Sequence, residues 1–364
     1  MNIIHWIGID DHADKWTIAH LKGNGEKLEK EFELMPSDAG YRKLIAYAKA
    51  LEGEVRIVYE AGPCGYDLYR RLTKAGLCCQ VAAPSLTPQK PGERVKTNRR
   101  DAAKLARYHR SGELTYIAVP DPKRESLRDM VRARGSVQKD LVRIQHQITK
   151  LVLRYGHRYR QGQAWTARFW VWLRAIQLEG EYSRAVLTEM ITAHEQRVAQ
   201  LERYDNLIEE AAQQPEYEPY LTALKVLRGI GTLSAMTILC ELGDLRRFSS
   251  APQLMAAIGL IPSEYGTGDK TTRFAITKTG NAHVRHIVVE AAWQYRRISN
   301  GKTITAKRKG QPQALVDIAQ KCDLRLNRKF HRMTSRNKLS TVAAVAVARE
   351  LLGFIWAMGQ VVHP

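Results

Sequence analysis

The chain has 364 residues, 44% of them hydrophobic and 26% charged, a composition that supports packed domains and excludes disorder along the whole chain. It contains no run of about 18 uncharged apolar residues and no signal-peptide pattern, so we expect a cytoplasmic protein with no membrane partner. The 57 Lys and Arg against 37 Asp and Glu give a net charge of +20 and predict a polyanionic partner, while five cysteines without CxxC spacing argue against a disulfide scaffold and a Cys-rich zinc site.

The positive charge is concentrated in two segments. Arg94–Arg134 holds 12 basic and 5 acidic residues, and Ser263–Lys338 holds 17 basic and 5 acidic residues. Clustering of this kind favours a nucleic-acid-binding surface over solvated charged faces, on which the excess would be spread more evenly. We therefore expect the protein to associate with the nucleoid.

Residues 1–118 show the pattern of an α/β domain. Three runs of apolar and β-branched residues predict an antiparallel meander, and Ser37 is placed to cap the helix that follows them. Strands and helices then alternate, so we expect one mixed sheet with helices packed against it. The predicted strands cover residues 3–10, 16–21, 28–34, 54–60 and 78–83, and the later helices cover about 65–75 and 99–111.

Residues 119–216 carry apolar side chains at alternating spacings of three and four. This spacing predicts two long helices that pair as an antiparallel hairpin or as an intermolecular coiled coil. His194 falls on the apolar stripe, and we expect a packed or half-exposed residue of the helix seam rather than a ligand. The aromatic segment Trp165–Trp172 lies between the two helices, and we interpret it as the core of a hairpin tip rather than as a nucleobase platform.

Residues 217–364 predict a mainly α-helical C-terminal domain. Leu227–Thr232 places Gly229 and Gly231 in a helix-hairpin-helix pattern, whose exposed amides and following helix start suit a DNA phosphate. A simple tight turn between two helices is the alternative. The last apolar helix, Val342–Trp356, is expected to be core or subunit contact.

Two carboxylates follow buried strands of the first domain. Asp10 ends the first strand and Glu60 ends the fourth, and in a mixed sheet of this order those ends can lie side by side. Asn98 and Asp101 are three residues apart, so they share a face if both are helical. Oxygen ligands from separate elements suit Mg²⁺ or Mn²⁺. The alternative is that the two acids do no more than end their strands.

Seven short motifs occur in order along the chain. They are Ile7–Asp10, Tyr59–Tyr66, Val95–Ala102, Leu227–Gly231, Phe248–Leu254, Gly259–Tyr265 and Ile276–Asn281. Together they resemble the DEDD insertion-sequence transposases, which have an N-terminal RuvC-like domain of the RNase H fold and a C-terminal transposase domain. The similarity spans about residues 3 to 300.

This resemblance implies four acidic metal ligands and a nucleophilic serine. Asp10, Glu60 and Asp101 match three of the acids, whereas the remaining acidic position holds Asn98, whose amide oxygen can ligate a metal but brings no charge. Asp11 and Asp14 lie nearby in the sequence, but Asp11 should point away from Asp10 if the strand continues.

The serine position of the family holds Thr267, and Ser263, four residues earlier in the same Gly-rich loop, is the alternative nucleophile. An unactivated hydroxyl is a weak nucleophile, so either residue depends on its surroundings for activation. The loop can also be interpreted as a phosphate-contacting segment whose hydroxyls only form hydrogen bonds.

The resemblance also implies partners. Family members act on element-end and target DNA as homodimers or homotetramers, join domains of different subunits in one active site, and in some cases use a structured guide RNA. Basic residues around the motifs and in the C-terminal segment are candidates for contacts with the nucleic-acid backbone. These are Lys96, Arg99, Arg100, Lys270, Arg273, Lys278, Lys307, Arg308 and Lys309.

The sequence therefore predicts a DNA transposase or recombinase that uses a divalent metal and a protein hydroxyl. Two alternatives stay open at this stage. One is a junction-resolving nuclease that uses metal-activated water and needs no protein nucleophile. The other is a catalytically degenerate protein that only binds nucleic acid. The departures from the family pattern at Asn98 and Thr267 support this alternative.

Overall fold

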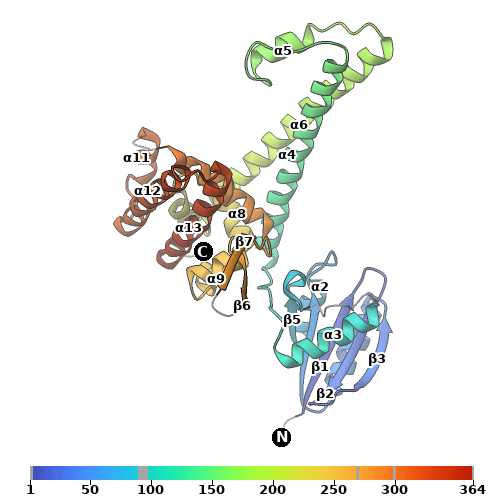
Figure 1. Cartoon of the computed structure of the whole chain (residues 1–364). Coiled ribbons are helices and arrows are strands. Elements are labelled where there is room, and N and C mark those ends of the chain that lie inside the picture. The colour runs from blue at the N-terminus through green and yellow to red at the C-terminus, as the bar shows by residue number, and fades with distance from the viewer. Residues whose placement is uncertain (1–2, 89–96, 268–269, 298–300, 363–364) are drawn as a thin grey trace. The chain divides into compact units, whose positions relative to one another are not determined.

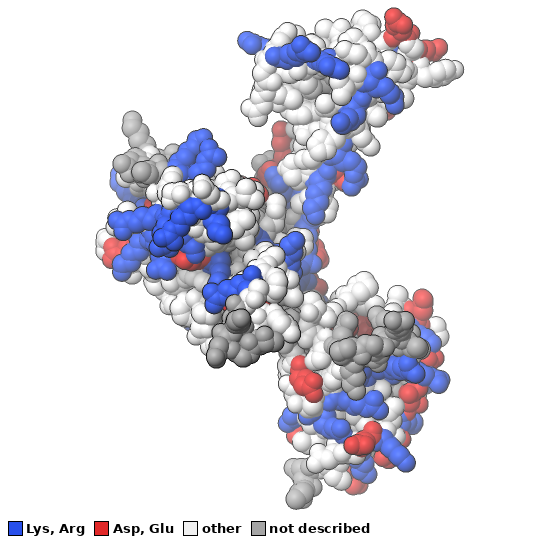
Figure 2. Space-filling view, in the orientation of Figure 1, with Lys and Arg blue, Asp and Glu red and all other residues white. Residues whose placement is uncertain are grey.

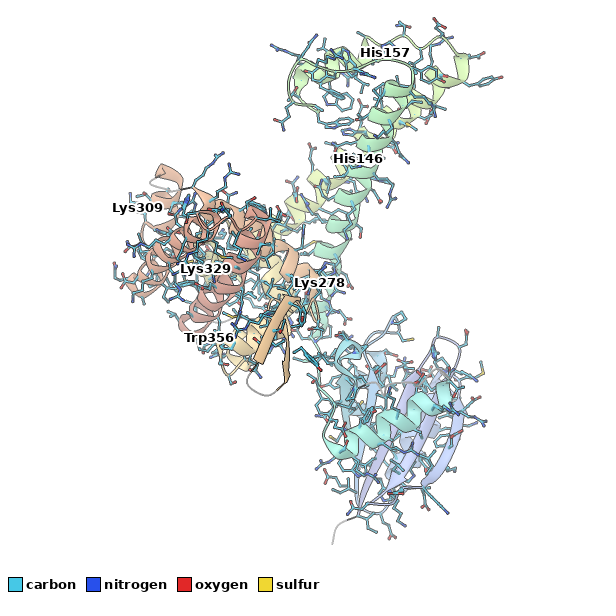
Figure 3. The ribbon with its side chains drawn as sticks, viewed as in Figure 1. His146, His157, Lys278, Lys309, Lys329 and Trp356 are labelled. Carbon is cyan, nitrogen blue, oxygen red and sulfur yellow. The ribbon has the colours of Figure 1, made fainter. Side chains whose placement is uncertain are left out.

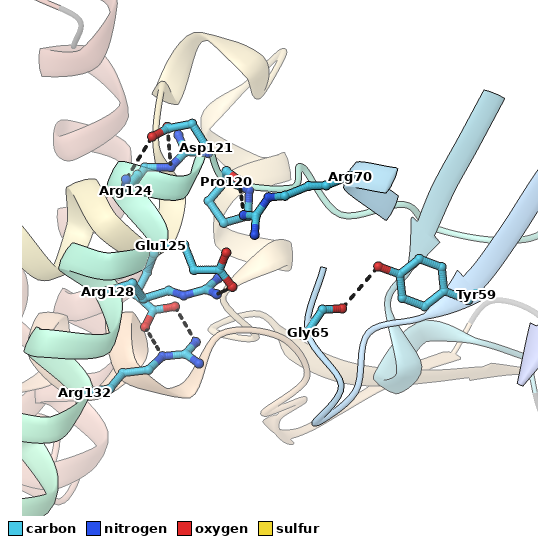
Figure 4. A network of polar contacts seen from close by, with 10 residues as sticks. Tyr59, Gly65, Arg70, Pro120, Asp121, Arg124, Glu125, Arg128 and Arg132 are labelled. Carbon is cyan, nitrogen blue, oxygen red and sulfur yellow. Dashed lines mark hydrogen bonds and ion pairs between the residues drawn. The ribbon is translucent and has the colours of Figure 1, made fainter. Parts of the chain in front are cut away.

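The computed structural model describes residues 3–88, 97–267, 270–297 and 301–362. The chain forms two compact units, residues 1–120 and 121–364 (Figure 1). The boundary is marked by two local contacts. Arg70 donates a hydrogen bond to the carbonyl of Pro120 (3.2 Å), and Asp121 caps the next helix by accepting from the amide of Arg124 (2.9 Å; Figure 4).

The first unit is built on a five-stranded mixed sheet, as the sequence predicted, and the structure gives the strand order β3-β2-β1-β4-β5. β1 is antiparallel to β2 and parallel to β4, β2 is antiparallel to β3, and β4 is parallel to β5. The strands are β1 (Ile4–Asp11), β2 (Trp16–Lys22), β3 (Leu28–Leu34), β4 (Glu54–Glu60) and β5 (Cys78–Ala82). The helical elements of this unit are α1 (Asp38–Lys49), α2 (Asp67–Lys74), the 3₁₀ turn η1 (Pro84–Leu86) and α3 (Asn98–Ser111).

Alternate residues of β1 face different layers. Ile7 and Ile9 are fully buried in a cluster that contains Leu44 of α1 and Leu72 of α2. Ser37 caps α1 by accepting a hydrogen bond from the amide of Gly40 (3.2 Å), which confirms the predicted start of that helix. The other face of the sheet is covered by α3, which packs against β1, β2 and β4.

The second unit begins with two long helices that pack along each other, α4 (Pro122–Arg154) and α6 (Glu181–Ala212) (Figure 1). The buried residues of α6 in its paired part are seven apart: Leu187, His194, Leu201 and Ile208. The short helix α5 (Ala167–Arg174) joins them at the far end, where Trp165, Phe169 and Trp170 pack as a tip cluster. His194 is 5% exposed and stacks on Trp165, so it is packed as expected.

The remainder of the second unit is mostly helical and shares one large core. Its elements are α7 (Glu218–Lys225), α8 (Thr232–Leu242), η2 (Leu245–Arg247), α9 (Ala251–Ala257), β6 (Pro262–Thr267), β7 (Lys270–Ile276), α10 (Ala282–Ala292), η3 (Trp293–Arg296), α11 (Lys302–Arg308), α12 (Gln313–Thr334) and α13 (Ser340–Val361). Within the described residues, α13 is the one helix long and apolar enough to cross a membrane, and 50% of its most apolar window is buried. It packs against α9, α10 and α12, so its apolar residues form core in this unit.

An ion pair between a buried carboxylate and a partly exposed arginine fixes the base of the long helices. Glu241 of α8, 2% exposed, accepts two hydrogen bonds from Arg132 of α4 (2.7 and 2.9 Å) and one from Asn281 (2.6 Å). Asn281 in turn caps α10 by accepting from the amide of Val284. Arg132 is labelled in Figure 4. These bonds tie α4, α8 and the start of α10 together, so the paired helices are anchored in the core that follows them.

Candidate active site

Asp10 and Glu60 end two neighbouring parallel strands. Ile9 of β1 pairs with Tyr59 of β4, so the next residues, Asp10 and Glu60, stand side by side. Side chains alternate between the faces of a strand, and Val58, two residues before Glu60, packs against α3. Both carboxylates therefore project from the face that α3 covers. Asp10 is 19% exposed, so it is partly withdrawn from solvent.

The helix α3 crosses β1 very closely at Gly8. A Cβ at this glycine would lie 2.2 Å from the carbonyl oxygen of Ala102 and 2.5 Å from the amide nitrogen of Ala106, so no other residue fits without movement. Toward its C-terminal end α3 places His109 edge-on against Trp6, near the start of β1. The helix therefore runs opposite to β1, and its first turn extends toward the strand end that carries Asp10.

Asn98 and Asp101 occupy that first turn. Thr97 caps α3 by accepting from the amide of Arg100, and Asn98 and Asp101 share the stripe that continues into the buried residues Ala102 and Leu105. Both residues are half-buried. The fold thus brings the two helix residues to the same face and the same end of the sheet as the two strand carboxylates.

The donor set fits a hard divalent cation. It consists of three carboxylates and one amide oxygen, the ligand types that Mg²⁺ and Mn²⁺ accept. Among the described residues, no group of three or more His, Cys, Asp or Glu side chains is close enough together to hold a metal ion by itself. Mg²⁺ in phosphate-processing sites is commonly held by one or two carboxylates together with waters and substrate phosphate oxygens, which an open arrangement permits.

Asp11 is excluded from this site, as the strand periodicity predicted. Its carboxylate accepts a hydrogen bond from Nε1 of Trp16 (2.8 Å), and it lines a separate cavity of about 470 Å³ with Tyr41 of α1 and Cys64. Burial raises the pKa of the Asp11 carboxyl. By contrast His12, which the sequence analysis did not single out, places Nε2 3.2 Å from the carboxylate of Asp10. His12 lies just beyond the end of β1, so the alternation of side chains along a strand did not predict this contact.

The segment that holds both candidate nucleophiles is a β-hairpin, which corrects the loop predicted from its glycines. β6 and β7 pair antiparallel, with Thr267 opposite Lys270 at the last position. The side chains of these two residues are outside the described part of the structure. Ser263 lies where the register shifts, and its hydroxyl donates to the carbonyl of Ala275 (3.1 Å). Arg273 pairs with Glu264 across the hairpin (2.7 Å).

The base of the hairpin is held by a close backbone contact. Gly280 has φ +79°, and a Cβ there would lie 1.9 Å from the carbonyl oxygen of Ala257 at the end of α9. Two residues earlier, Lys278 also has a positive φ (56°), an uncommon conformation for a residue with a side chain. Lys278 is exposed beside the end of β7 and is labelled in Figure 3. The chain is thus tightly constrained where it leaves the hairpin.

The basic residues proposed for nucleic-acid contact lie in different settings. Arg99 pairs with Glu31 of β3 (3.0 Å), and Arg100 is exposed on the same turn of α3. Arg308 pairs with Asp323 (2.6 Å) and is half-buried, whereas Lys307 is exposed. Lys309, labelled in Figure 3, is exposed, and Lys96 lies outside the described residues.

The turn between α7 and α8 contains Gly229 and Gly231. Gly231 is the N-cap of α8, and Lys307 donates to the carbonyl of Ile230 between the two glycines (3.2 Å). Burial, with Lys225 nearby, lowers the pKa of the Lys307 amine. The amine is therefore engaged with this turn in the structure.

Comparison with known proteins shows the family of this chain. Residues 7–157 match the DEDD transposase family model named for IS110, and residues 221–307 match the model described as "Transposase IS116/IS110/IS902 family". "Putative transposase y4qE" of Sinorhizobium fredii is 39% identical over 98% of this chain and 88% of its own length. The chain belongs to the IS110 family of DEDD transposases.

Further relatives of the transposase are described by the same activity. The "Transposase for insertion sequence element IS1533" of Leptospira borgpetersenii is 30% identical over 92% of this chain and 97% of its own length. The corresponding protein for element IS1111A of Coxiella burnetii is 24% identical over 73% of this chain. The protein is accordingly an insertion-sequence DNA transposase, and the family predicted from the seven motifs is confirmed.

Proposed function

We propose that the transposase cuts and rejoins DNA with a divalent cation held by Asp10, Glu60, Asp101 and Asn98 and with the hydroxyl of Thr267 as nucleophile. The observation that carries this proposal is the parallel register of β1 and β4, in which Ile9 pairs with Tyr59, the residues directly before Asp10 and Glu60. The cation, Mg²⁺ or Mn²⁺, would neutralise charge on the scissile phosphate and polarise it.

Asn98 distinguishes this metal site from one with four carboxylates. Its amide oxygen ligates without charge, so the site holds three negative charges and needs the phosphate as a further oxygen donor. Side by side, the carboxylates of Asp10 and Glu60 repel each other unless a cation lies between them. The binding of the cation should therefore increase the affinity for DNA, and the binding of DNA should increase the affinity for the cation.

Thr267 is the favoured nucleophile because the hydroxyl of Ser263 is already donated to the carbonyl of Ala275. Attack by Oγ of Thr267 on phosphorus forms a phosphothreonine bond and breaks the bond to the 3′ oxygen. The proton lost from the threonine ends on that oxygen, which leaves as a 3′-hydroxyl. A 3′-hydroxyl of another strand then attacks the phosphothreonine and releases the threonine hydroxyl, which completes strand transfer.

A basic groove on α12 supports contact with a nucleic-acid backbone. It has a volume of about 880 Å³ and is lined by cations from successive turns of α12 and by Glu350 and Phe354 of α13. The cations are Lys321, Arg325, Arg328, Lys329 and Arg332. Figure 2 shows Lys and Arg gathered over this part of the second unit, and Lys329 is labelled in Figure 3. Such a surface binds phosphates without reading sequence, so sequence choice falls to other features or to a guide RNA.

The partners we propose follow the resemblance: element-end and target DNA, a structured guide RNA, and further copies of the chain as a dimer or tetramer. The same proposal includes three further features. They are the division of the chain into three parts at residues 118 and 216, the coiled-coil character of α4 and α6, and the helix-hairpin-helix role of Gly229 and Gly231. The seven-residue spacing along α6 and the N-cap position of Gly231 support them.

The decisive experiment traps the covalent intermediate on a suicide DNA substrate that carries the element ends. Wild type with Mg²⁺ should yield a protein–DNA adduct, Thr267→Ala should abolish it, and Ser263→Ala should retain it. Asp10→Ala should lose cleavage while DNA binding persists, and the exposed neighbour Asp14→Ala is the matched control that keeps both. Cleavage without an adduct would instead establish a nuclease that uses activated water, and an adduct in Thr267→Ala would refute the assignment of the nucleophile.

A further inference from the structure

Thr17 of β2 is the cross-strand neighbour of Asp10. The two residues pair directly in the antiparallel register of β1 and β2. Thr17 is fully buried, and within the described part of the chain its Oγ1 has no hydrogen-bond partner. The hydroxyl therefore lies in the interior next to the carboxylate proposed as a metal ligand.

The face on which Thr17 lies follows from its neighbours on the strand. Ala19, two residues further along β2, packs against Ala102 and Ala103 of α3, so Thr17 also projects from the face covered by α3. Directly opposed residues of an antiparallel pair have Cβ atoms about 4.5–5.5 Å apart. The hydroxyl of Thr17 is thus within side-chain reach of the carboxylate of Asp10.

A buried hydroxyl without a partner is unfavourable for folding. Leaving such a group unsatisfied destabilises the folded state, and valine has nearly the same shape without that penalty. The strand would therefore be more stable with valine at position 17, as far as packing alone is concerned. Because packing does not explain a buried hydroxyl without a partner, its presence in a folded protein points to a functional role.

We propose that Thr17 is a positioning residue for the metal site: its hydroxyl, which has no partner within the described residues, donates a hydrogen bond to the carboxylate of Asp10 when that carboxylate binds the cation, and so orients it. The inference rests on the metal site proposed above. Ligating carboxylates are commonly oriented by hydrogen bonds from a surrounding set of residues, whose loss lowers metal affinity or activity by about 10–100-fold. In the structure Asp10 contacts the exposed His12, and Thr17 offers a donor from the buried side.

The test compares Thr17→Val and Thr17→Ser in the full-length transposase. Mn²⁺ binding is measured by titration followed by electron paramagnetic resonance, and thermal unfolding is measured with the metal chelated. We expect Thr17→Val to bind Mn²⁺ about tenfold more weakly, while its metal-free melting temperature is equal to or above that of wild type. Thr17→Ser, which keeps the hydroxyl, should restore Mn²⁺ affinity.

Two results separate this inference from the metal site itself. Asp10→Asn should lose Mn²⁺ binding. If it does, but Thr17→Val binds Mn²⁺ as tightly as wild type, the metal site is supported and Thr17 has no positioning role. If Asp10→Asn also binds normally, the metal site is refuted, and the role of Thr17 falls with it. Should Thr17→Val fail to fold, Thr17→Ala removes the same hydroxyl and is subject to the same Mn²⁺ criterion.

Discussion

Replacing Gly8 by alanine tests whether the crossing of α3 over β1 sets the active-site geometry. The added Cβ would lie 2.2 Å from the carbonyl oxygen of Ala102. Carbon–oxygen contacts in proteins are about 3.3–3.6 Å, so α3 must move away by about 1 Å. Overpacking of this kind costs about 1–3 kcal/mol of stability. Because α3 carries Asn98 and Asp101, the same movement displaces two of the four proposed metal ligands, and a displacement of about 1 Å can lower a rate by about 100-fold.

The assay measures strand cleavage on element-end DNA alongside urea unfolding and DNA affinity. Gly8→Ala should unfold at lower urea, cleave about 100-fold more slowly and bind DNA nearly as wild type does. Gly135→Ala is the matched control, since Gly135 lies within α4 with no atom within 4 Å of its added Cβ. It should keep cleavage and gain about 0.5–1 kcal/mol of stability. Wild-type stability and cleavage in Gly8→Ala would refute the close crossing of α3.

Three further predictions concern charge. Burial lowers the pKa of His20 to about 4, from 6.5, and does the same for His109. Between pH 6.5 and 4 each histidine is neutral in the folded protein but protonated in the unfolded chain. The free energy of unfolding should therefore fall as pH drops through this range, by about 3 kcal/mol for each histidine. Urea unfolding across the range measures the loss, and a free energy that does not change with pH would contradict it. Arg132→Ala leaves the carboxylate of Glu241 with only the hydrogen bond from Asn281 and should cost about 1–3 kcal/mol, detectable by calorimetry, with an unchanged transition as the refuting result. Arg328→Ala should reduce the salt dependence of DNA binding by about 0.9 in the slope of log K against log salt, and an unchanged slope would remove Arg328 from the interface.

The sheet and its acidic edge were accessible from the sequence. The apolar runs and turn residues of the first 60 positions predicted the observed bounds of β4, Glu54–Glu60. The capping residue Ser37 predicted the start of α1. The structure places β4 next to β1 and parallel to it, so Asp10 and Glu60 end neighbouring strands, an arrangement that the predicted mixed sheet allowed. Local patterns sufficed here because the core imposes a strict period of two on each strand.

The hairpin β6–β7 was missed because its stability is not encoded in a buried face. Tyr265 and Phe274, its largest apolar residues, are 65% and 59% exposed, so the apolar alternation that signals a strand is absent. The importance of Thr17 was equally hidden, because a threonine in a strand is ordinary until its partner across the sheet is known. His12 required the same cross-element information, since its contact with Asp10 depends on the path of the chain after β1.

The seven-residue spacing of the α4–α6 pair makes its length adjustable. Leu141 and Leu201 share one packed layer, and Ile148 and Leu187 share another nearer the tip. Because seven residues complete two helical turns, removing one such block from each helix would shorten the pair by about 10 Å and restore the same packing around the gap. The Glu241–Arg132 anchor at the base and the Trp165 cluster at the tip would both survive. This pair of helices is therefore a spacer whose reach can change in discrete steps during evolution, without redesign of either end.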